Sequence, residues 1–488
     1  MCFHKNSFIP FFCLILFSAN GQINVNSDSV SKIKHPDSLL TIPKDPLRAA
    51  GLVLANNLAV WTNDRLIEGG AYARINLNTI KFNFKTGFVG DNDWFVTNLL
   101  AHPYHGSTYF NAARSNGMNF WQSVPFAATG SLMWEFLLEN EPASINDFIS
   151  STVGGSSLGE ICYRVSDRFI DDRTVGFDRF RREALLTLIS PLTGLNRILT
   201  GEAWKHRNVR GNSTPAIPLT FYSSIGHRIL ADGAQTKHDV SNMLCYDLGL
   251  FYGNPFDPEN EKPYDFFTFK LSGNLFSRQS VISRINLIGL LYSSDICPLK
   301  TGRQLTWGIF QHYNFYQLDA ESNVSLNPYK LSETASFGPG ILFKSNLTNQ
   351  IIFSGSAHLS VILLGGNQSD HYTPGYRDYN MGSGFSSKLN FELLLDSRAR
   401  LCLNAENYRI YSWIGNLPYI TETSGPSARG EAGHADQSII LLNFSYMIGS
   451  HILLSAETGY YYRRNVYAYY PETIHSISEK KLSVGYIF

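Results

Sequence analysis

Two histidines and three carboxylates in the first half of the chain have the residue types and spacing that could support chemistry. His102 and His105 are three residues apart, and Glu135, Asp147 and Glu160 follow downstream. A neutral imidazole beside carboxylates can bind a divalent metal ion, or it can act as a general base that an acid orients. These five residues are therefore the candidate catalytic residues. The sequence leaves open whether a metal binds, and no Walker or Rossmann spacing indicates an organic cofactor.

Structural roles compete with chemistry for the same residues. Residues 144–147 (SIND) and 157–160 (SLGE) both have the pattern of a capping box, in which the final acid returns to the first backbone N–H. Asp147 and Glu160 are the acids of these two boxes. Pro103 disfavours a helical conformation for the residue before it, so the two histidines are interpreted as a helix start or turn, satisfied by backbone carbonyls. This structural interpretation is favoured over the catalytic one.

A Gly-x-Ser-x-Gly pattern occurs at residues 155–159 (GSSLG). A nucleophile elbow of this type needs a strand that enters and a helix that leaves. Here a helix is expected to enter and to stop at Gly154 and Gly155. Ser157 is therefore predicted to be the N-cap of the next helix rather than a nucleophile.

The helical pattern that positions these residues begins near residue 91, with expected helix ends at Gly117 and before Pro191. Its motifs, in order, are 91–98 (DNDWFVTN), 102–107 (HPYHGS), 109–117 (YFNAARSNG), 134–135 (WE), 144–147 (SIND) and 154–160 (GGSSLGE). This set resembles an uncharacterised family of Gram-negative outer-membrane proteins, known only as a domain of unknown function, over about residues 55–205. The resemblance implies a location in the envelope and supplies no established activity. The order His, Glu, Asp, then Gly-x-x-x-Gly is also similar to the VanZ-like membrane families.

Composition excludes several classes of protein. The chain has 488 residues, of which 16% are charged, against about 25% in an average soluble domain. Lys+Arg and Asp+Glu balance at 40 each, so the clustered basic excess of a nucleic-acid binder is missing. Hydrophobic residues make up 44%, which argues against intrinsic disorder.

The N-terminus has the features of an export signal. Lys5 precedes an apolar stretch at 8–17 (FIPFFCLILF), and Ala19 and Gly21 stand where a signal peptidase reads small residues. Residues 1–21 are therefore predicted to be a signal peptide, followed by a flexible periplasmic lead over 22–50. Beyond the signal, the remaining cysteines form no metal-binding spacing; they are Cys162, Cys245, Cys297 and Cys402.

From residue 214 to the end, apolar and polar residues alternate with a period of two, which predicts strands. Turn-forming clusters separate about twelve such segments, near 217–229, 241–252, 264–275, 280–292, 302–316, 332–345, 349–364, 379–395, 398–413, 437–448, 451–464 and 474–488. The last segment places Leu482, Val484, Tyr486 and Phe488 on one face and resembles the closing strand of outer-membrane barrels. The polar faces carry charges, at Lys270, Arg284, Glu392, Arg400, Glu406 and Glu457. A charged lumen with an apolar exterior is typical of a transmembrane barrel.

The sequence therefore predicts an α+β membrane protein of the cell outer membrane. Residues 51–213 are expected to form a mostly α-helical periplasmic domain, and residues 214–488 an antiparallel transmembrane β-barrel of about 12 strands. A barrel of that size could admit one helix, so most of the helical part is placed in the periplasm, with one segment rising into the lumen at most. The expected partners are outer-membrane lipids and, during biogenesis, the barrel assembly machinery.

Three hypotheses for the function follow. The first is a non-catalytic barrel with a helical periplasmic cap, serving transport or a structural role in the envelope. The second is an enzyme embedded in the membrane, a hydrolase or transferase of lipid or lipopolysaccharide, that uses His102, His105, Glu135 and Asp147. A third, weaker hypothesis is a partner-docking or assembly protein.

Overall fold

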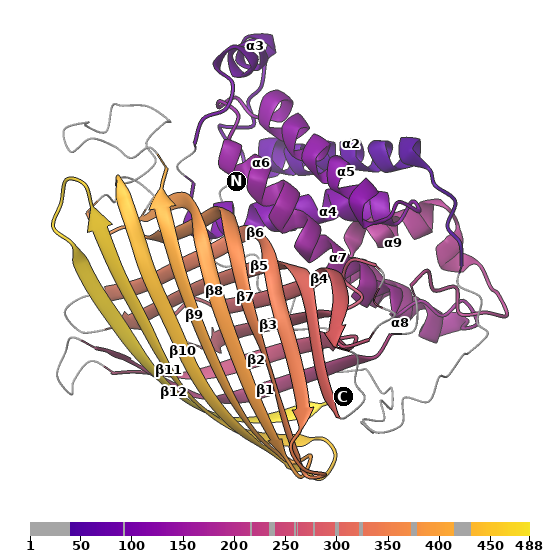
Figure 1. The fold of residues 1–488 in the computed structure, drawn as a ribbon. Coiled ribbons are helices and arrows are strands. Elements are labelled where there is room, and N and C mark those ends of the chain that lie inside the picture. Colours follow the sequence, from indigo (N-terminus) through magenta and orange to yellow (C-terminus); the bar gives the residue numbers. More distant parts are fainter. Residues whose placement is uncertain are drawn as a thin grey trace. The chain divides into compact units, whose positions relative to one another are not determined.

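A computed structural model shows two compact units, one helical and one a β-barrel (Figure 1). The helical unit comprises residues 1–90 and 100–216, and the barrel unit comprises residues 91–99 and 217–488. The structure describes residues 40–90, 93–214, 217–233, 240–257, 260, 262–276, 279–297, 302–321, 326–371, 378–413 and 431–488. The predicted signal peptide and most of the predicted lead lie outside the described residues.

The helical unit is built around one central helix, α4 (His102–Arg114), which packs against α2, α5 and α7. Eleven of its thirteen residues are buried, as expected for a helix with neighbours on all sides. The other helices, with their π-helical and 3₁₀ turns, are α2 (Pro46–Thr62), η2 (Asn63–Ile67), α3 (Leu77–Thr86), η3 (Thr97–Ala101), α5 (Phe120–Met133), η4 (Trp134–Leu138), α6 (Ile145–Ile149), η5 (Ser150–Gly154), α7 (Gly155–Asp167), α8 (Gly176–Ile189), α9 (Pro191–Leu199) and η6 (Glu202–Trp204).

Helix boundaries follow local capping residues. Asp45 accepts a hydrogen bond from the Arg48 backbone N–H, and Pro46 occupies the first helical turn, so α2 begins before the predicted boundary at residue 51. The predicted ends at Gly117, which has φ of +80°, and before Pro191 are confirmed. Among the described helices, none combines the length and the apolar character that a membrane crossing requires.

The helix break predicted at Gly154 and Gly155 is wrong. The chain is helical without interruption from α6 through η5 into α7, and Gly154 and Gly155 both have φ near −60°. Their role is close packing instead, because a Cβ on Gly155 would lie 2.7 Å from the backbone carbon of Gly106 in α4. Two helices can approach this closely only where neither carries a side chain.

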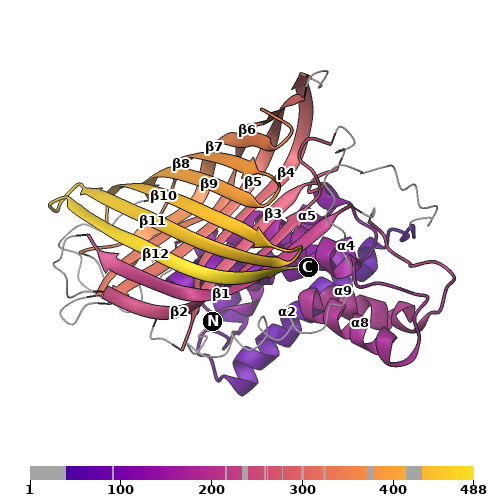
Figure 2. The same ribbon diagram turned by 90° about the horizontal axis from the view of Figure 1, so that it is seen from below.

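The barrel unit is a closed antiparallel barrel, in which each strand pairs with its neighbours in sequence and β12 closes against β1 (Figure 2). The predicted transmembrane barrel of about 12 strands is confirmed. Its strands are β1 (Leu219–Asp232), β2 (Val240–Tyr252), β3 (Phe267–Leu275), β4 (Ile282–Cys297), β5 (Arg303–Glu321), β6 (Leu326–Asn346), β7 (Ile351–Gln368), β8 (Tyr379–Leu395), β9 (Ala399–Ser412), β10 (Gly433–Ile448), β11 (Ile452–Tyr467) and β12 (Thr473–Ile487).

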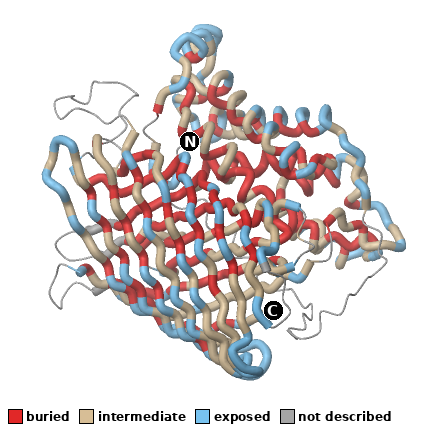
Figure 3. Tube along the Cα trace, in the orientation of Figure 1, coloured by how far each residue is buried: buried red, intermediate tan, exposed pale blue. Residues whose placement is uncertain are grey.

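Along the strands, exposed and buried positions alternate (Figure 3). On β12, Leu482 is 68% exposed and Val484 is 53% exposed, whereas Lys481 and Ser483, which alternate with them, are buried. The apolar face predicted for the last strand therefore points outward and the charged face points into the lumen. Because the sheet is closed, it has no free strand edge with unpaired backbone groups. The closed sheet and its apolar exterior together allow the barrel to cross a lipid bilayer.

One short segment from the first half of the chain packs with the barrel. The Tyr379 hydroxyl donates to the Asp93 carbonyl at 2.9 Å, and Asn98 Nδ2 donates to the Tyr379 hydroxyl at 2.7 Å. Phe95 contacts the ring of Phe315 at 5.1 Å between centroids. Tyr379 shares its face of β8 with the exposed, outward-facing Phe385, so this segment covers the outer wall rather than rising into the lumen.

Candidate functional site

Three of the five candidate residues meet in the interior of the helical unit. His102 at the start of α4, Glu135 in η4 and Asp147 in α6 place ligand atoms within 4.8 Å of one another. His102 Nε2 lies 3.5 Å from Asp147 Oδ2. Their exposed fractions are 5%, 1% and 3%, so the three side chains are removed from water.

Neighbouring donors fix the two carboxylates. The Ser144 backbone N–H donates to Glu135 Oε2 at 2.8 Å, and Asn146 Nδ2 donates to Asp147 Oδ1 at 2.9 Å. Ser144 also caps α6, since its Oγ accepts from the Asp147 backbone N–H. The predicted capping box is thus half correct: the serine caps, but the acid that returns to its N–H is Glu135. The contact of Glu135 with the N-terminus of α6 could not be predicted from the capping-box pattern, because Glu135 lies outside that pattern.

His105 lies one helical turn from His102 and has different partners. Its Nε2 is 2.9 Å from the Tyr109 hydroxyl, which donates its one proton to Asn57 Oδ1. His105 must then donate from Nε2. Burial, with a smaller contribution from the charge of His102, lowers the pKa of His105 to about 3. A ring that is neutral, buried and already donating is a poor general base at neutral pH.

The lowered pKa of His105 predicts that acid destabilises the helical unit. The unfolded chain binds a proton at His105 near pH 6.5 whereas the fold resists it down to about pH 3, so stability is present above pH 6.5 and is lost as pH falls through that window. At pH 5 the loss relative to neutral pH should be about 2 kcal/mol. Urea unfolding followed at 222 nm checks this. The His105→Phe variant should lose that part of the pH dependence, and an unchanged slope would contradict the assignment.

Glu160, the fifth candidate, belongs to a separate ion-pair cluster. Its carboxylate accepts from Arg114 Nε at 2.7 Å and Nη2 at 3.0 Å, and from Arg164 Nε at 2.8 Å. The Arg114 guanidinium also lies 4.3 Å from the centre of the Tyr163 ring. Glu160 is fully buried and does not act as the acid of a capping box. Three side chains on two helices therefore form a structural clasp that the sequence pattern did not indicate.

Ser157, predicted to be an N-cap, lies inside α7, where its Oγ donates to the Val153 carbonyl at 3.2 Å. It lies on a continuous helix rather than on a strand-to-helix turn, so the geometry of a nucleophile elbow is missing at this serine.

Charged side chains fill the barrel lumen and pair across it. Arg284 on β4 contacts Glu457 on β11 at 3.0 Å, although β3, β2, β1 and β12 separate these strands around the barrel. Lys481 pairs with both Asp247 and Glu457 at 3.0 Å. Further buried pairs are Arg228–Glu479, Lys388–Glu333 and Arg463–Asp370. Of the charges predicted from the sequence, Arg284 and Glu457 belong to this network of ion pairs.

A buried apolar and tyrosine cluster lies in the same lumen. The Tyr316 ring on β5 lies 6.4 Å from the Tyr461 ring on β11, and Tyr329 on β6 lies 5.5 Å from the same ring. The Tyr316 hydroxyl donates to Glu406 on β9 at 2.8 Å. The whole cluster consists of Leu230, Met243, Tyr316, Leu318, Tyr329, Leu331, Ile362, Tyr408, Ile410, Ile439, Leu441, Tyr461 and Ile477. Opposite walls therefore touch through their side chains.

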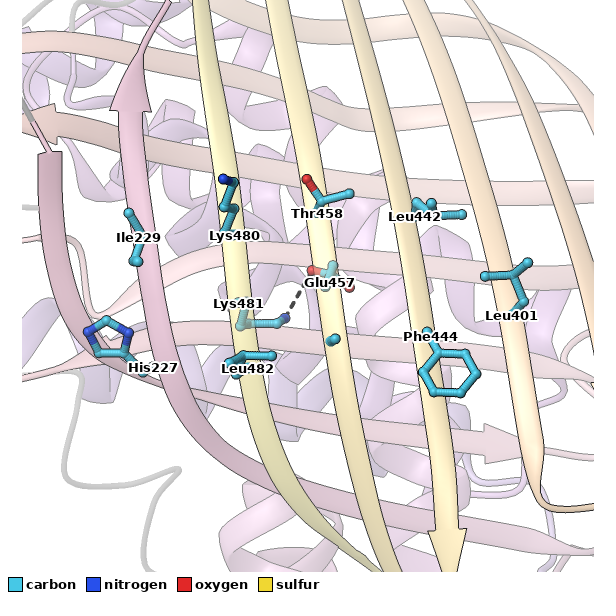
Figure 4. A pocket seen from close by; sticks show the side chains of 11 residues that line it. His227, Ile229, Leu401, Leu442, Phe444, Glu457, Thr458, Lys480, Lys481 and Leu482 are labelled. Carbon is cyan, nitrogen blue, oxygen red and sulfur yellow. Dashed lines mark ion pairs between the residues drawn. The ribbon is translucent and has the colours of Figure 1, made fainter. Parts of the chain in front are cut away.

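A hollow marks the wall formed by β1 and β9–β12 (Figure 4). Leu442, Phe444 and Leu482 line it with their outward-facing side chains, and Lys480 stands at its edge. The Glu457–Lys481 ion pair lies behind it on the lumen side. Its apolar lining is suited to the acyl chains of the surrounding bilayer.

The closed sheet, the apolar exterior and the compensated polar lumen define the class: this protein is a transmembrane β-barrel of the outer-membrane type with an N-terminal helical region. Residues 87–192, in the helical part, match the family described as "Domain of unknown function (DUF3943)". The predicted resemblance to an uncharacterised family is confirmed, and the similarity to VanZ-like families stays a prediction. No curated protein matches the chain.

Solved structures with similarity to this chain include two outer membrane channels and a porin. An outer membrane channel from Pseudomonas putida F1 has 8% identity and a TM-score of 0.30, covering 56% of this chain and 97% of that one. The outer membrane channel DcaP of Acinetobacter baumannii has 9% identity and a TM-score of 0.24, covering 56% and 97%. The KdgM porin has 9% identity and a TM-score of 0.22, covering 54% and 98%.

Proposed function

We propose that this protein is a filled outer-membrane barrel that anchors the helical unit in the envelope and does not conduct solutes through an open pore. The observation that carries the proposal is the contact between opposite walls, through the Arg284–Glu457 ion pair and the tyrosine cluster. Side chains fill the interior of barrels of about 8 strands, and open aqueous channels are found at about 16–18 strands. A 12-strand barrel lies between these sizes, so the contacts across the lumen, rather than the strand number, carry the proposal.

The energetic argument favours a closed lumen at rest. Arg284 and its partner Glu457 lie with side-chain exposures of 8% and 11%. Separating the two side chains removes one of the two cations that contact Glu457, the other being Lys481 at 3.0 Å. Loss of one partner of a buried ion pair costs about 3–5 kcal/mol. The tyrosine cluster must separate as well before solute can pass. An open state would therefore be rare without a trigger.

Conductance measurements test the filled barrel. Purified full-length protein in a planar lipid bilayer should show no stable channel steps. The variant Tyr316→Ala/Tyr329→Ala/Tyr461→Ala, which removes the contacts between walls, should show them. Arg409→Ala is the matched control, because Arg409 pairs with Asp436 and is 42% exposed on its side chain. A shift in gel mobility on boiling verifies that each variant is folded, and regular wild-type channel steps would overturn the proposal.

Placement of the helical unit in the periplasm is part of this proposal. So is recognition of the C-terminus by the barrel assembly machinery. Phe488 closes the barrel beside β1, where its backbone N–H donates to the Phe221 carbonyl at 2.9 Å. This contact supports a role for Phe488 in joining the last strand to β1.

The alternative is an enzyme of the membrane that acts on lipid or lipopolysaccharide. One observation favours it: His102, Glu135 and Asp147 converge. Two observations weigh against it. His105 is held by Tyr109, and the three converging side chains are at most 5% exposed, so a lipid substrate would reach them only after the helices moved apart. The anchoring role is therefore preferred.

A further inference from the structure

We propose that His102, Glu135 and Asp147 bind one divalent transition-metal ion, for which Zn²⁺ is the reference. The ligand set has one imidazole nitrogen and two carboxylates and no sulfur. Such sets suit Zn²⁺ and, among its competitors, Mn²⁺ or Fe²⁺. Ca²⁺ is disfavoured, because it takes six to eight oxygen ligands.

The distances are close to those of a metal site. Zinc binds imidazole nitrogen and carboxylate oxygen at about 2.0–2.2 Å in tetrahedral geometry, so two ligand atoms lie roughly 3.3 Å apart. His102 Nε2 and Asp147 Oδ2 are 3.5 Å apart, and all three ligand atoms lie within 4.8 Å. A small contraction, within the reach of side-chain rotations, would complete the site. Three protein ligands leave the fourth position for water.

Charge supplies the second argument. Glu135 and Asp147 are 1% and 3% exposed, and two carboxylates buried side by side repel each other. A divalent cation among the three ligand atoms would place two positive charges beside both carboxylates, and in a low-dielectric interior this attraction is strong.

Neighbouring groups orient the ligands, as they do in metal sites. Ser144 holds one oxygen of Glu135 through its backbone N–H, and Asn146 holds Oδ1 of Asp147, while Oδ2 faces His102. Ser151 Oγ donates to the His102 carbonyl at 3.2 Å, which fixes the start of α4 against η5. The ligands are thus positioned by contacts that need no metal.

A bound metal ion would link three separate elements of the helical unit, which are α6, η4 and the start of α4. A ligand that binds the fold and not the unfolded chain stabilises the fold by mass action. The site is therefore inferred to be structural.

The test uses the full-length protein in detergent. After EDTA treatment and removal of the chelator, Zn²⁺ titration should give one equivalent bound and should raise the urea midpoint of helix unfolding. Co²⁺ in place of Zn²⁺ should give visible absorption bands of a tetrahedral or five-coordinate nitrogen–oxygen site. The variants His102→Gln and Asp147→Asn should lower the affinity at least 100-fold.

Asp178→Asn is the control, because Asp178 is an exposed helix carboxylate that pairs with Arg181 and Arg182. It should bind Zn²⁺ as the wild type does. If wild-type protein binds neither Zn²⁺ nor Mn²⁺ stoichiometrically, the proposal is wrong, whether or not the variants fold. Equal affinity of Asp147→Asn and wild type would place the metal elsewhere and would also overturn it.

Discussion

Replacement of Gly106 by alanine is expected to destabilise the helical unit by about 3 kcal/mol or more. A Cβ at this position would lie 1.8 Å from the Ser151 carbonyl oxygen and 2.5 Å from its carbonyl carbon. These are backbone atoms, which cannot rotate away as a flexible side chain can. Helix α4 would have to move off η5 and α7, and that movement opens the buried contacts of all three elements. Alanine's better helix propensity, about 1 kcal/mol, is too small to compensate.

The same substitution at Gly51 is the matched control. Gly51 lies inside α2 and is exposed, and a Cβ there meets nothing within 4 Å. Gly51→Ala should therefore stabilise the helix by about 0.5–1 kcal/mol, through the loss of backbone freedom in the unfolded chain. Urea unfolding of the two full-length variants, read at 222 nm, should show midpoints that move in opposite directions. A Gly106→Ala midpoint equal to that of the wild type would mean that α4 and η5 are not in contact.

The barrel could be predicted from the sequence because its signal is local and repeated. A period of two, as in Leu482, Val484 and Tyr486, is imposed on every strand by lipid outside and polar groups inside. Each strand pairs with its neighbours in sequence, so the strand order needed no long-range information. The alternation of apolar and polar residues could not predict which charged side chains form ion pairs across the lumen. Arg284 and Glu457 are 173 residues apart, and each alone indicates only a polar face.

The candidate site was only partly predictable. Residue type singled out His102, Glu135 and Asp147, and the fold brings them together. Local pattern failed for Glu160, because its partner Arg114 lies on another helix. The local pattern also gave a wrong prediction at Gly155, because the sequence alone does not distinguish a glycine that permits close helix packing from one that ends a helix. In each case a contact between distant segments overrode a local preference.

Replacement of Glu160 by glutamine should cost the helical unit about 3–5 kcal/mol, because it removes a buried negative charge that contacts two buried guanidinium groups. Side-chain exposure is 13% for Arg114, 2% for Arg164 and 0% for Glu160 itself. Glutamine has nearly the same shape and can still accept a hydrogen bond, so the loss reports on charge rather than on a cavity. Two neighbouring arginines would also repel each other once the carboxylate is gone.

Unfolding of full-length Glu160→Gln in urea at pH 7, read at 222 nm, measures this cost. Glu202→Gln is a suitable comparison. Glu202 also meets two cations, Lys205 and Arg207, but its side chain is 24% exposed, and water can take over part of their solvation. Its substitution should cost about 1 kcal/mol or less. The difference between the two variants thus separates burial from the number of partners. Equal costs would mean that solvent reaches the Glu160 clasp, and the two arginines would then stabilise α4 and α7 mainly through packing, such as that of Arg114 on Tyr163.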